Sequence, residues 1–342
     1  MSGCSDGVIK CKNGDIVSFR SMDYPIGQDA KVIISTKGKT YKSKTPDGTY
    51  GLEWTSEVGF VGCIAFDVVV DGINEHGLSF AALVLDITQY PPYKNSSRSI
   101  GISYLGPWIL QFKNIAEIKI AIKDVHIWDN RTLEGLTTTP GLHIAVHDSE
   151  GNNLVIEFIN GETLIYDNPN GVLTNDPPFQ SQLDYLLLYS HLNNGTPTDA
   201  IESCGNISTN MIGLPGDFSP ITRFVRASIG VKFSTKAENS DDALPAARAI
   251  LNMVQIPKGL LRMNGHDLLT RWSVFRDHNN RKIYYNSWSD NTLKLIDLNK
   301  ICFEPLIEYH PILIDHPIKQ NYIDVTERFV SPNATIGLYN KV

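Results

Sequence analysis

The sequence predicts an α+β fold in which strands and helices form separate layers. Several short apolar or alternating segments have the composition of β-strands, and fewer segments have the longer periodicity of helices. The predicted strands occur in groups, and so do the predicted helices, whereas a protein built from βαβ units would alternate them. We therefore expect layered sheets and helices, and no dinucleotide-binding unit.

The predicted elements follow from these patterns along the chain. The predicted strands are Ile16–Phe19, Phe60–Val70, Leu78–Leu85, His143–Val146, Leu154–Phe158, Ser273–Phe275 and Lys282–Tyr285. The predicted helices are Pro107 to about Lys123, Gln180 to about His191, and Ala243 to about Met253. No internal repeat, low-complexity tract or long Pro/Ser linker divides the chain.

The composition is that of a globular protein and argues against several functional classes. The 342 residues are 42% hydrophobic and 20% charged, with a net charge of -7, whereas a nucleic-acid-binding protein would normally show a basic face. No apolar run approaches the roughly 18 residues of a membrane span, and the N-terminus lacks the pattern of a secretory signal. We therefore expect a cytoplasmic protein whose scattered cysteines are free thiols.

The first predicted hairpin brings Cys4 close to Arg20 and Asp23. The dipeptide Asn13-Gly14 is typical of a two-residue hairpin loop, and with that loop Asp23 would face Cys4 and Arg20 would face Gly7. A bulge or a longer loop would shift the register by a residue or two, so the prediction is proximity rather than a specific pairing. A surface ion pair beside a small buried cysteine would explain the same residues.

A cysteine at a chain terminus can carry its own base. If Met1, Ser2 and Gly3 were removed, the α-amine of Cys4 would have a pKa of about 7.7–8 and could accept the thiol proton. A neighbouring guanidinium would favour the thiolate, and a neighbouring carboxylate could orient the amine. Such a nucleophile needs no histidine.

Blocks of sequence along nearly the whole chain resemble the choloylglycine hydrolase family, N-terminal cysteine amidases that include bile salt hydrolases and penicillin V acylases. The blocks occur in the family's order and are Arg20–Asp23, Asp71–Leu78, Gly171–Pro177, and Gly213–Pro220 followed by Arg223-Phe224. The segment TRWSVFRDHNNRKIYY also resembles the C-terminal hairpin of the penicillin-acylase-like, Gram-negative branch. The chain is therefore identified as a member of this family.

The resemblance implies a fold and a domain organisation. The fold is the four-layer αββα sandwich of N-terminal nucleophile hydrolases, with two antiparallel sheets packed together and helices on both outer faces. Residues 1–3 would be a leader that is removed on maturation, and residues 4–342 would form a single domain. Family members commonly form homotetramers, so we expect a homo-oligomer that binds neither nucleic acid nor a membrane.

The resemblance also implies roles in the hydrolysis of a non-peptide C–N amide bond. Cys4 matches the family nucleophile, and Arg20 and Asp23 match the residues that activate and position it. Asn175 matches the side-chain donor of the oxyanion hole, and Arg223 matches an arginine that supports the site. Without the resemblance, Asn175 would be assigned to a turn and Arg223 to the solvated surface. No metal or other cofactor is implied.

One position departs from the family pattern. Val84 occupies the place where relatives carry Asn, Tyr or Trp, so its backbone N–H could still donate to the oxyanion but its side chain offers the substrate no donor. Tyr24 follows Asp23, where the penicillin-acylase-like branch carries a large aromatic residue, and we expect it to form one wall of the acyl pocket. A wide apolar slot favours a phenoxyacetyl or medium-chain fatty acyl group over a conjugated bile acid, and bile salt hydrolysis is the alternative.

Two rival functions remain open on the sequence. A chain that keeps its leader would be a catalytically silent binding or structural protein of the same fold. A papain-like thiol hydrolase would instead need a catalytic histidine. His143 and His147 have the spacing of zinc ligands on a helix, but their segment has the pattern of a strand, and no acidic third ligand is placed with them. We therefore expect both histidines to be structural.

Overall fold

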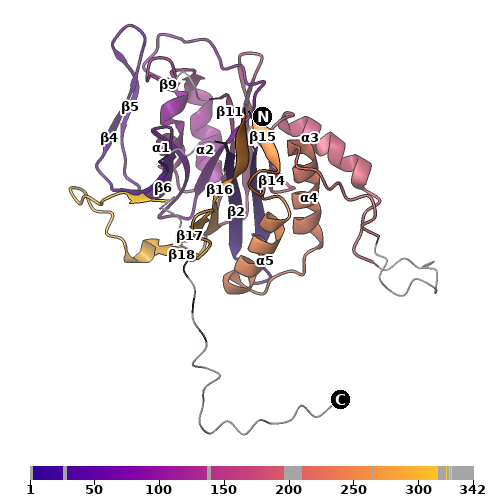
Figure 1. Cartoon of the computed structure of the whole chain (residues 1–342). Helices are drawn as coiled ribbons and strands as arrows, with labels where there is room; N and C mark the ends of the chain where they lie inside the picture. Colours follow the sequence, from indigo (N-terminus) through magenta and orange to yellow (C-terminus); the bar gives the residue numbers. More distant parts are fainter. Residues whose placement is uncertain are drawn as a thin grey trace, which may run out of the picture.

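Two large antiparallel sheets lie face to face, and helices cover both outer faces (Figure 1). The computed structural model describes residues 3–25, 29–136, 140–195, 210–263, 265–314, 321, 323 and 325. The predicted α+β class and the αββα sandwich are both confirmed.

The first sheet carries the N-terminal strands. In spatial order it contains β14 (Val172–Leu173), β1 (Gly3–Lys10), β2 (Ile16–Tyr24), β16 (His266–Asp277), β17 (Lys282–Ser287) and β18 (Lys294–Asp297), with β15 (Leu261–Met263) paired to β16. Strand β1, which carries Cys4, thus lies between β14 and β2, and β2 carries Arg20 and Asp23.

The second sheet is built largely from the middle of the chain. In spatial order it contains β13 (Glu162–Asp167), β12 (Asn153–Ile159), β11 (Leu142–His147), β8 (Ser79–Val84), β7 (Val68–Asn74), β6 (Phe60–Ala65), β3 (Lys31–Ser35) and β19 (Ile312–Leu313). Two smaller sheets pair β4 (Thr40–Lys44) with β5 (Tyr50–Thr55), and β9 (Ser99–Gly101) with β10 (His126–Trp128).

The helices divide between the two outer faces. Of the helices that cover the first sheet, α4 (Pro220–Phe233) packs on β1 and α5 (Ser240–Asn252) packs on β2, while α3 (Phe179–Leu186) packs on α4. On the second sheet, α1 (Leu105–Ile109) packs on β7 and β8, and α2 (Ile115–Ala121) follows it. Short 3₁₀ turns complete the description: η1 (Ile102–Tyr104), η2 (Ile122–Asp124), η3 (Leu187–Tyr189) and η5 (Leu298–Lys300). No helix of the described residues is long and apolar enough to cross a membrane.

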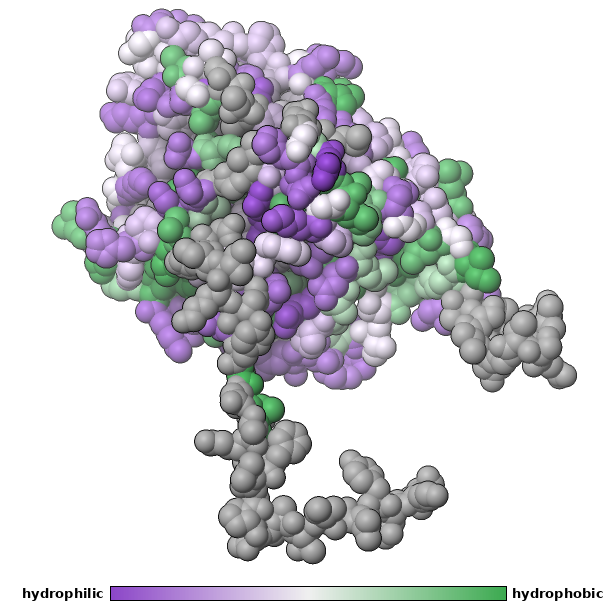
Figure 2. Space-filling view, viewed as in Figure 1, coloured by the Kyte–Doolittle hydropathy of each residue, from purple (hydrophilic) through white to green (hydrophobic). Residues whose placement is uncertain are grey.

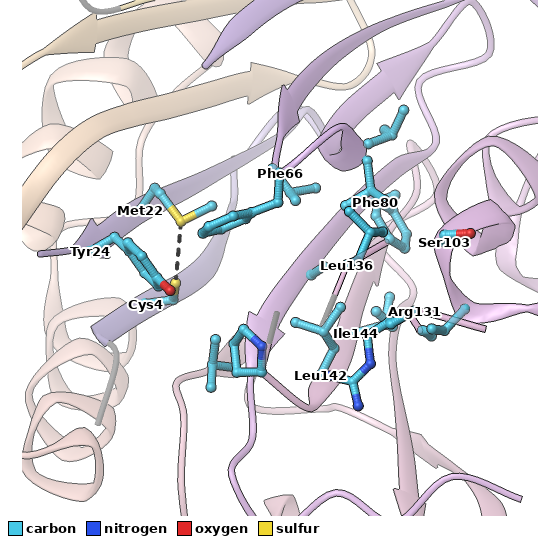
Figure 3. Close-up of a pocket in the computed structure, with 17 residues that line it drawn as sticks. Cys4, Met22, Tyr24, Phe66, Phe80, Ser103, Arg131, Leu136, Leu142 and Ile144 are labelled. Carbon is cyan, nitrogen blue, oxygen red and sulfur yellow. Dashed lines mark hydrogen bonds between the residues drawn. The ribbon is translucent and has the colours of Figure 1, made fainter. Parts of the chain in front are cut away.

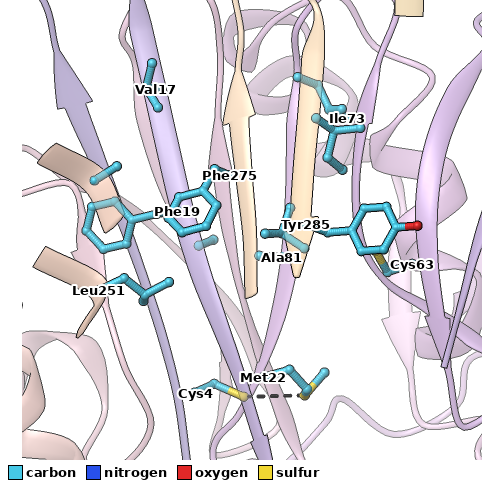
Figure 4. Close-up of a cluster of buried hydrophobic side chains, with 14 of the residues drawn as sticks. Cys4, Val17, Phe19, Met22, Cys63, Ile73, Ala81, Leu251, Phe275 and Tyr285 are labelled. Atoms are coloured by element: carbon cyan, nitrogen blue, oxygen red, sulfur yellow. Dashed lines mark hydrogen bonds between the residues drawn. The ribbon is translucent and has the colours of Figure 1, made fainter. Parts of the chain in front are cut away.

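A hydrophobic core fills the space between the sheets and extends under α5. Phe19 and Phe275 of the first sheet face the helices with Leu251 of α5, while Ile73 and Ala81 of the second sheet lie in the layer between the sheets (Figure 4). A second buried cluster lies between the second sheet and its helices. Strands covered on both faces bury every side chain, which explains the continuous apolar runs seen in the sequence.

The first hairpin is longer than predicted. Its loop is Lys12–Gly14, and the glycine has a φ of 97°, the left-handed conformation that closes a loop one residue longer than the two-residue type. Cys4 therefore faces Met22, and Arg20 faces Asp6. The predicted register was wrong by one residue, whereas the predicted proximity of Cys4 and Arg20 is confirmed.

Two predicted segments are divided in the structure. The segment Phe60–Val70 forms two strands, because Phe66 and Asp67 have φ values of 53° and 58° and turn the chain back. The segment Pro107–Lys123 forms α1 and α2 rather than one helix, and Asn114 caps the second by accepting a hydrogen bond from the Glu117 N–H. Helix α4 was not predicted at all, although it begins with the favourable Ser219-Pro220 pair.

Candidate active site

Cys4 lies near the start of β1, buried between the layers and beside an apolar pocket (Figure 3). Its Sγ lies 3.8 Å from Met22 Sδ and 3.9 Å from Arg20 Nη2, and its backbone N–H donates to Asn175 Oδ1 at 2.6 Å. In the described part of the chain, these thiol partners include no histidine. The rival arrangement of a Cys–His pair therefore has no support in this geometry.

Electrostatics at Cys4 oppose spontaneous ionisation of the thiol. Burial raises the pKa of the Cys4 thiol above its ordinary value; Arg20, Arg223 and the Asp23 backbone N–H act in the opposite direction, and the Asp23 carboxylate adds to the rise. A buried thiol with a raised pKa needs a nearby base to become a nucleophile.

Arg20 is completely buried in β2 and reaches the second sheet. Its Nη1 donates to Val70 O and to Asp71 Oδ2, both at 3.0 Å, and its Nη2 donates to Ala82 O. Burial alone would lower the pKa of Arg20, but Cys4 and Asp71 raise it above its ordinary value. Arg20 is therefore a permanent positive charge next to the Cys4 sulfur.

Asp23 faces Gly3 across the hairpin rather than Cys4. Its Oδ1 accepts a hydrogen bond from Thr270 Oγ1 at 2.6 Å, and its Oδ2 accepts one from Ser21 Oγ at 3.2 Å. Burial raises the pKa of Asp23 to about 6, although Arg223, 3.7 Å away, acts to lower it. The carboxyl group thus lies at the residue that precedes Cys4, with its orientation fixed by two hydroxyl groups.

The Asn175 side chain is oriented by its neighbours. Its Oδ1 accepts from the Cys4 N–H and from Arg223 Nη2 at 2.8 Å, so its Nδ2 must be turned the other way, where it donates to Val84 O at 2.8 Å. In a β-strand the N–H and C=O of one residue point to the same edge, so the Val84 N–H points to the side on which Asn175 lies. Two donors next to a buried thiol are the arrangement of an oxyanion hole.

Arg223 projects from α4 into the same cluster. Its Nη1 donates to Cys4 O and to Ser5 Oγ, each at 2.7 Å, and its Nε donates to Phe218 O at 3.1 Å. Burial lowers the pKa of Arg223, whereas Asp23 and Cys4 raise it. Arg223 thus ties the helix to the start of β1 and fixes the amide of Asn175, so the structure brings together all five residues assigned to catalysis.

Several residues at the site were missed by sequence reasoning. Thr270 and Ser21 hold Asp23, and Gln182 holds the segment of Asn175 by donating to Asn175 O at 2.6 Å and to Pro177 O at 2.7 Å. Gln182 is completely buried within a predicted amphipathic helix, so a polar residue on its apolar face was the available clue. No sequence pattern linked Thr270 to the hairpin, because 247 positions separate it from Asp23.

The two histidines set aside as structural lie in β11, as predicted. His143 is buried between Glu157 Oε1 at 3.0 Å and Thr174 O at 2.7 Å, and so supports the residue before Asn175. His147 contacts Asp6 Oδ1 at 2.5 Å. No group of three or more possible metal ligands occurs among the described residues.

The pocket beside Cys4 is lined mainly by apolar side chains from both sheets. Tyr24 and Phe66 form one part of its wall with their rings 5.0 Å apart, edge to face, and Val84 also lines it. Ser103 and Arg131 also line it and lie at the end opposite Cys4 in Figure 3. The predicted pocket positions of Tyr24 and Val84 are therefore found in the structure.

Comparison with known proteins identifies the family. Residues 4–306 match the model of the linear amide C–N hydrolases, choloylglycine hydrolase family. The chain belongs to the choloylglycine hydrolase family. It is accordingly a linear amide C–N hydrolase, and the matched region of the family begins at Cys4.

Relatives of this choloylglycine hydrolase family member include both of the activities that its sequence suggested. Penicillin V acylase from Pectobacterium atrosepticum is 28% identical over 313 residues, which cover 84% of this chain and 78% of the relative. Bile salt hydrolase/transferase from Lactiplantibacillus plantarum is 30% identical over 292 residues, which cover 82% of this chain and 88% of the relative.

Solved structures share the fold. A variant of the conjugated bile acid hydrolase from Clostridium perfringens has a TM-score of 0.80 at 24% identity and covers 94% of this chain and 100% of its own. Penicillin V acylase from Agrobacterium tumefaciens has a TM-score of 0.75 at 24% identity and covers 89% of each chain. The two sheets and their covering helices are therefore those of the choloylglycine hydrolase fold.

Proposed function

We propose that the protein is an N-terminal cysteine amidase that hydrolyses an N-acyl amide of the penicillin V type, with Cys4 as its nucleophile. The observation that carries the proposal is the convergence of Cys4, Arg20, Asp23 and the Asn175 amide in one buried cluster beside an apolar pocket. An acyl group in that pocket would place its carbonyl carbon next to the Cys4 sulfur.

The reaction follows from the donors and acceptors around the sulfur. The α-amine of Cys4 takes the thiol proton, and the thiolate attacks the amide carbon while Asn175 Nδ2 and the Val84 N–H stabilise the oxyanion. The protonated amine then gives its proton to the leaving nitrogen, and the C–N bond breaks to leave a thioester on Cys4. Water, deprotonated by the same amine, hydrolyses the thioester and restores the thiol.

The mechanism requires a free α-amine on Cys4, so the proposal includes removal of residues 1–3. The cramped surroundings of Gly3 support a role for glycine at this point: a Cβ there would lie 2.8 Å from Ile256 Cδ1 and 3.0 Å from Asp23 Oδ2. A side chain at position 3 would have to displace the Ile256 side chain or the Asp23 carboxyl group, whereas glycine needs neither to move. Residues 4–342 would then form the mature domain.

Intact-mass measurement tests maturation directly. We expect the active wild-type protein to lack Met1–Gly3, and we expect Cys4→Ala to retain them and to have no amidase activity, because the thiol would start its own release. A correctly trimmed Cys4→Ala protein would mean that a host peptidase cuts the chain. A full-length wild-type chain without turnover would instead support the silent binding protein.

The acyl specificity is proposed from the pocket lining. Val84 offers no donor for the polar face of a steroid, and Tyr24 with Phe66 presents an apolar wall that suits a phenoxyacetyl or medium-chain acyl group. We therefore expect a higher kcat/KM for penicillin V or N-acyl homoserine lactones than for glycocholate. A preference for glycocholate would identify the alternative, conjugated bile salt hydrolysis. A relative of this chain is named as a bile salt hydrolase/transferase.

A cytoplasmic location and a homo-oligomeric state complete the proposal. Free thiols support the first, since Cys4, Cys11, Cys63 and Cys302 form no disulfide within the described part of the chain. For the second, Figure 2 shows hydrophobic residues gathered near the end of α3, where Leu187 and Leu188 are 70% and 67% exposed. Exposed apolar side chains in a group are typical of contacts between subunits.

A further inference from the structure

A charged cluster interrupts the hydrophobic layer between the two sheets. Asp71 of β7 accepts hydrogen bonds from Arg20 of β2 and from Arg276 of β16, and all three side chains are 0% exposed. Asp71 Oδ2 accepts from Arg20 Nη1 at 3.0 Å and from Arg276 Nη2, while Asp71 Oδ1 accepts from Arg276 Nε at 2.9 Å. One carboxylate from the second sheet therefore binds two arginines of the first.

Such a cluster is not explained by stability alone. Charges transferred from water to a protein interior lose hydration, and well-packed apolar residues in the same place are often at least as stabilising. Apolar side chains occupy other parts of this layer, as Ile73 and Ala81 show. The position of the cluster suggests its purpose, because Arg20 reaches from Asp71 to the Cys4 sulfur.

The contacts of Arg20 divide between its two terminal nitrogens. Nη1 is bound by Asp71 and by Val70 O, whereas Nη2 lies 3.9 Å from Cys4 Sγ. Asp71 is in turn fixed by the two-nitrogen contact of Arg276. Without Asp71, the oxygen acceptors left to the Arg20 guanidinium would be the carbonyls of Val70 and Ala82, and Arg276 would keep Asp6, 3.5 Å away, as its carboxylate partner.

We propose that Asp71 and Arg276 are positioning residues that hold the Arg20 guanidinium beside the Cys4 thiol. Asp71 provides the fixed counter-charge, and Arg276 orients its carboxylate from the opposite side. The inference rests on the proposed function, in which Cys4 is the nucleophile. It extends the active site from the end of the first sheet into the second sheet.

Positioning and simple electrostatics predict opposite results when Asp71 is neutralised. As a negative charge acting through space, Asp71 disfavours the thiolate, so its loss alone would lower the pKa of Cys4. If Asp71 acts by holding Arg20, its loss moves the favourable cation away and the pKa of Cys4 rises. The other charged or titratable groups around Cys4, Arg20 and this cluster are the same in both cases: Asp6, Asp23, Tyr24, Cys63, His147, Arg223 and His278.

The experiment measures the rate of inactivation by iodoacetamide against pH, together with kcat and KM, for wild type and Asp71→Asn. We expect the midpoint of the inactivation profile to rise by about one pH unit and kcat to fall at least about tenfold, with a smaller change in KM. An unchanged midpoint, or a lower one, would overturn the proposal.

Two further variants make the test specific. Ser18→Ala removes a different contact of Arg276, a 3.0 Å hydrogen bond from Nη1, and should leave the inactivation profile unchanged; the same shift as in Asp71→Asn would overturn the proposal. If Asp71→Asn does not fold, Arg276→Lys keeps the charge but loses the two-nitrogen contact, and should shift the midpoint upward by a smaller amount. An unmoved midpoint in Arg276→Lys would likewise refute the role.

The wild-type data separate this inference from the function on which it rests. If alkylation of Cys4 leaves wild-type turnover intact, both the nucleophile assignment and the positioning role are wrong. If alkylation stops turnover and the variants keep the wild-type profile, only the positioning role is wrong.

Discussion

At the scale of a single residue, the buried carboxylate of Asp23 lowers the stability of the folded state. The side chain is buried among Thr270, Ser21 and Arg223, and burial raises its pKa to about 6 from an ordinary value of 3.8. A carboxyl group that resists ionisation in the folded state destabilises that state once it must ionise. Other residues of the cluster share this pattern, since Cys4 also has a raised pKa because of burial.

The cost at Asp23 leads to a prediction about stability and pH. The folded pKa is raised, so its stabilising contribution is present below pH 3.8 and is lost as the pH rises through about 6. The test compares the unprocessed Cys4→Ala protein with the same protein that also carries Asp23→Asn. The Asn variant's advantage in the free energy of unfolding should grow by about 1.4 kcal/mol between pH 5 and pH 8. Urea unfolding at both pH values measures it, and a difference that stays constant or shrinks would contradict the burial argument.

Individual elements were predicted best where their side chains follow a simple pattern. The strands from Leu78 to Leu85 and from Leu154 to Phe158 were found because buried strands give short apolar runs. The turn at Phe66–Asp67 was missed because a single Asp inside an apolar run, without a neighbouring Gly, Asn or Pro, is a weak turn signal, and Phe rarely adopts a positive φ. Helix α4 was missed because Arg223 and Arg226 lie on its buried side, where apolar residues are expected.

The end of β8 carries the prediction about chain length. Each methylene buried in the pocket should be worth about 0.8 kcal/mol, or roughly fourfold in kcat/KM, for the wild type. Val84→Trp fills part of the pocket and should penalise the longest acyl chains most, while the backbone N–H and the removal of the leader are unchanged. Measuring kcat/KM across N-acyl homoserine lactones of increasing length tests this.

A matched variant controls for the effect of an added tryptophan. Ile165 lies on β13 of the same sheet, is 37% exposed and does not line the pocket. Ile165→Trp should keep the wild-type dependence on chain length. If Val84→Trp also keeps that dependence, Val84 does not limit the acyl pocket.

At the scale of the whole molecule, the site exists only because distant segments meet. Asn175 lies 171 positions from Cys4, and Arg223 lies 219 positions from it, yet both donate to or accept from its backbone. The resemblance to a family named these residues, whereas composition and periodicity could not, because neither reports which strands become neighbours. The buried Asp71–Arg276 pair had no local pattern either, since its partners come from opposite sheets.

The proposed nucleophile, Cys4, is distinguished from the other described thiols by its surroundings. Cys11 is buried, and burial raises its pKa to about 11; burial raises the pKa of Cys63 even further. Cys302 is exposed and will react with alkylating agents, so Cys302→Ser provides a background without that thiol. In this background, Cys4 is the described cysteine that a small reagent should reach, because it lies beside the pocket. Its alkylation should abolish activity.

Mass analysis of the N-terminal peptide during inactivation by iodoacetamide tests the central claim most directly. We predict that amidase activity falls in proportion to alkylation of a Cys4 that bears a free α-amine, and that EDTA leaves the activity unchanged. Full activity with Cys4 completely alkylated, or an active chain that still carries Met1–Gly3, would contradict the assignment of Cys4 as an N-terminal nucleophile.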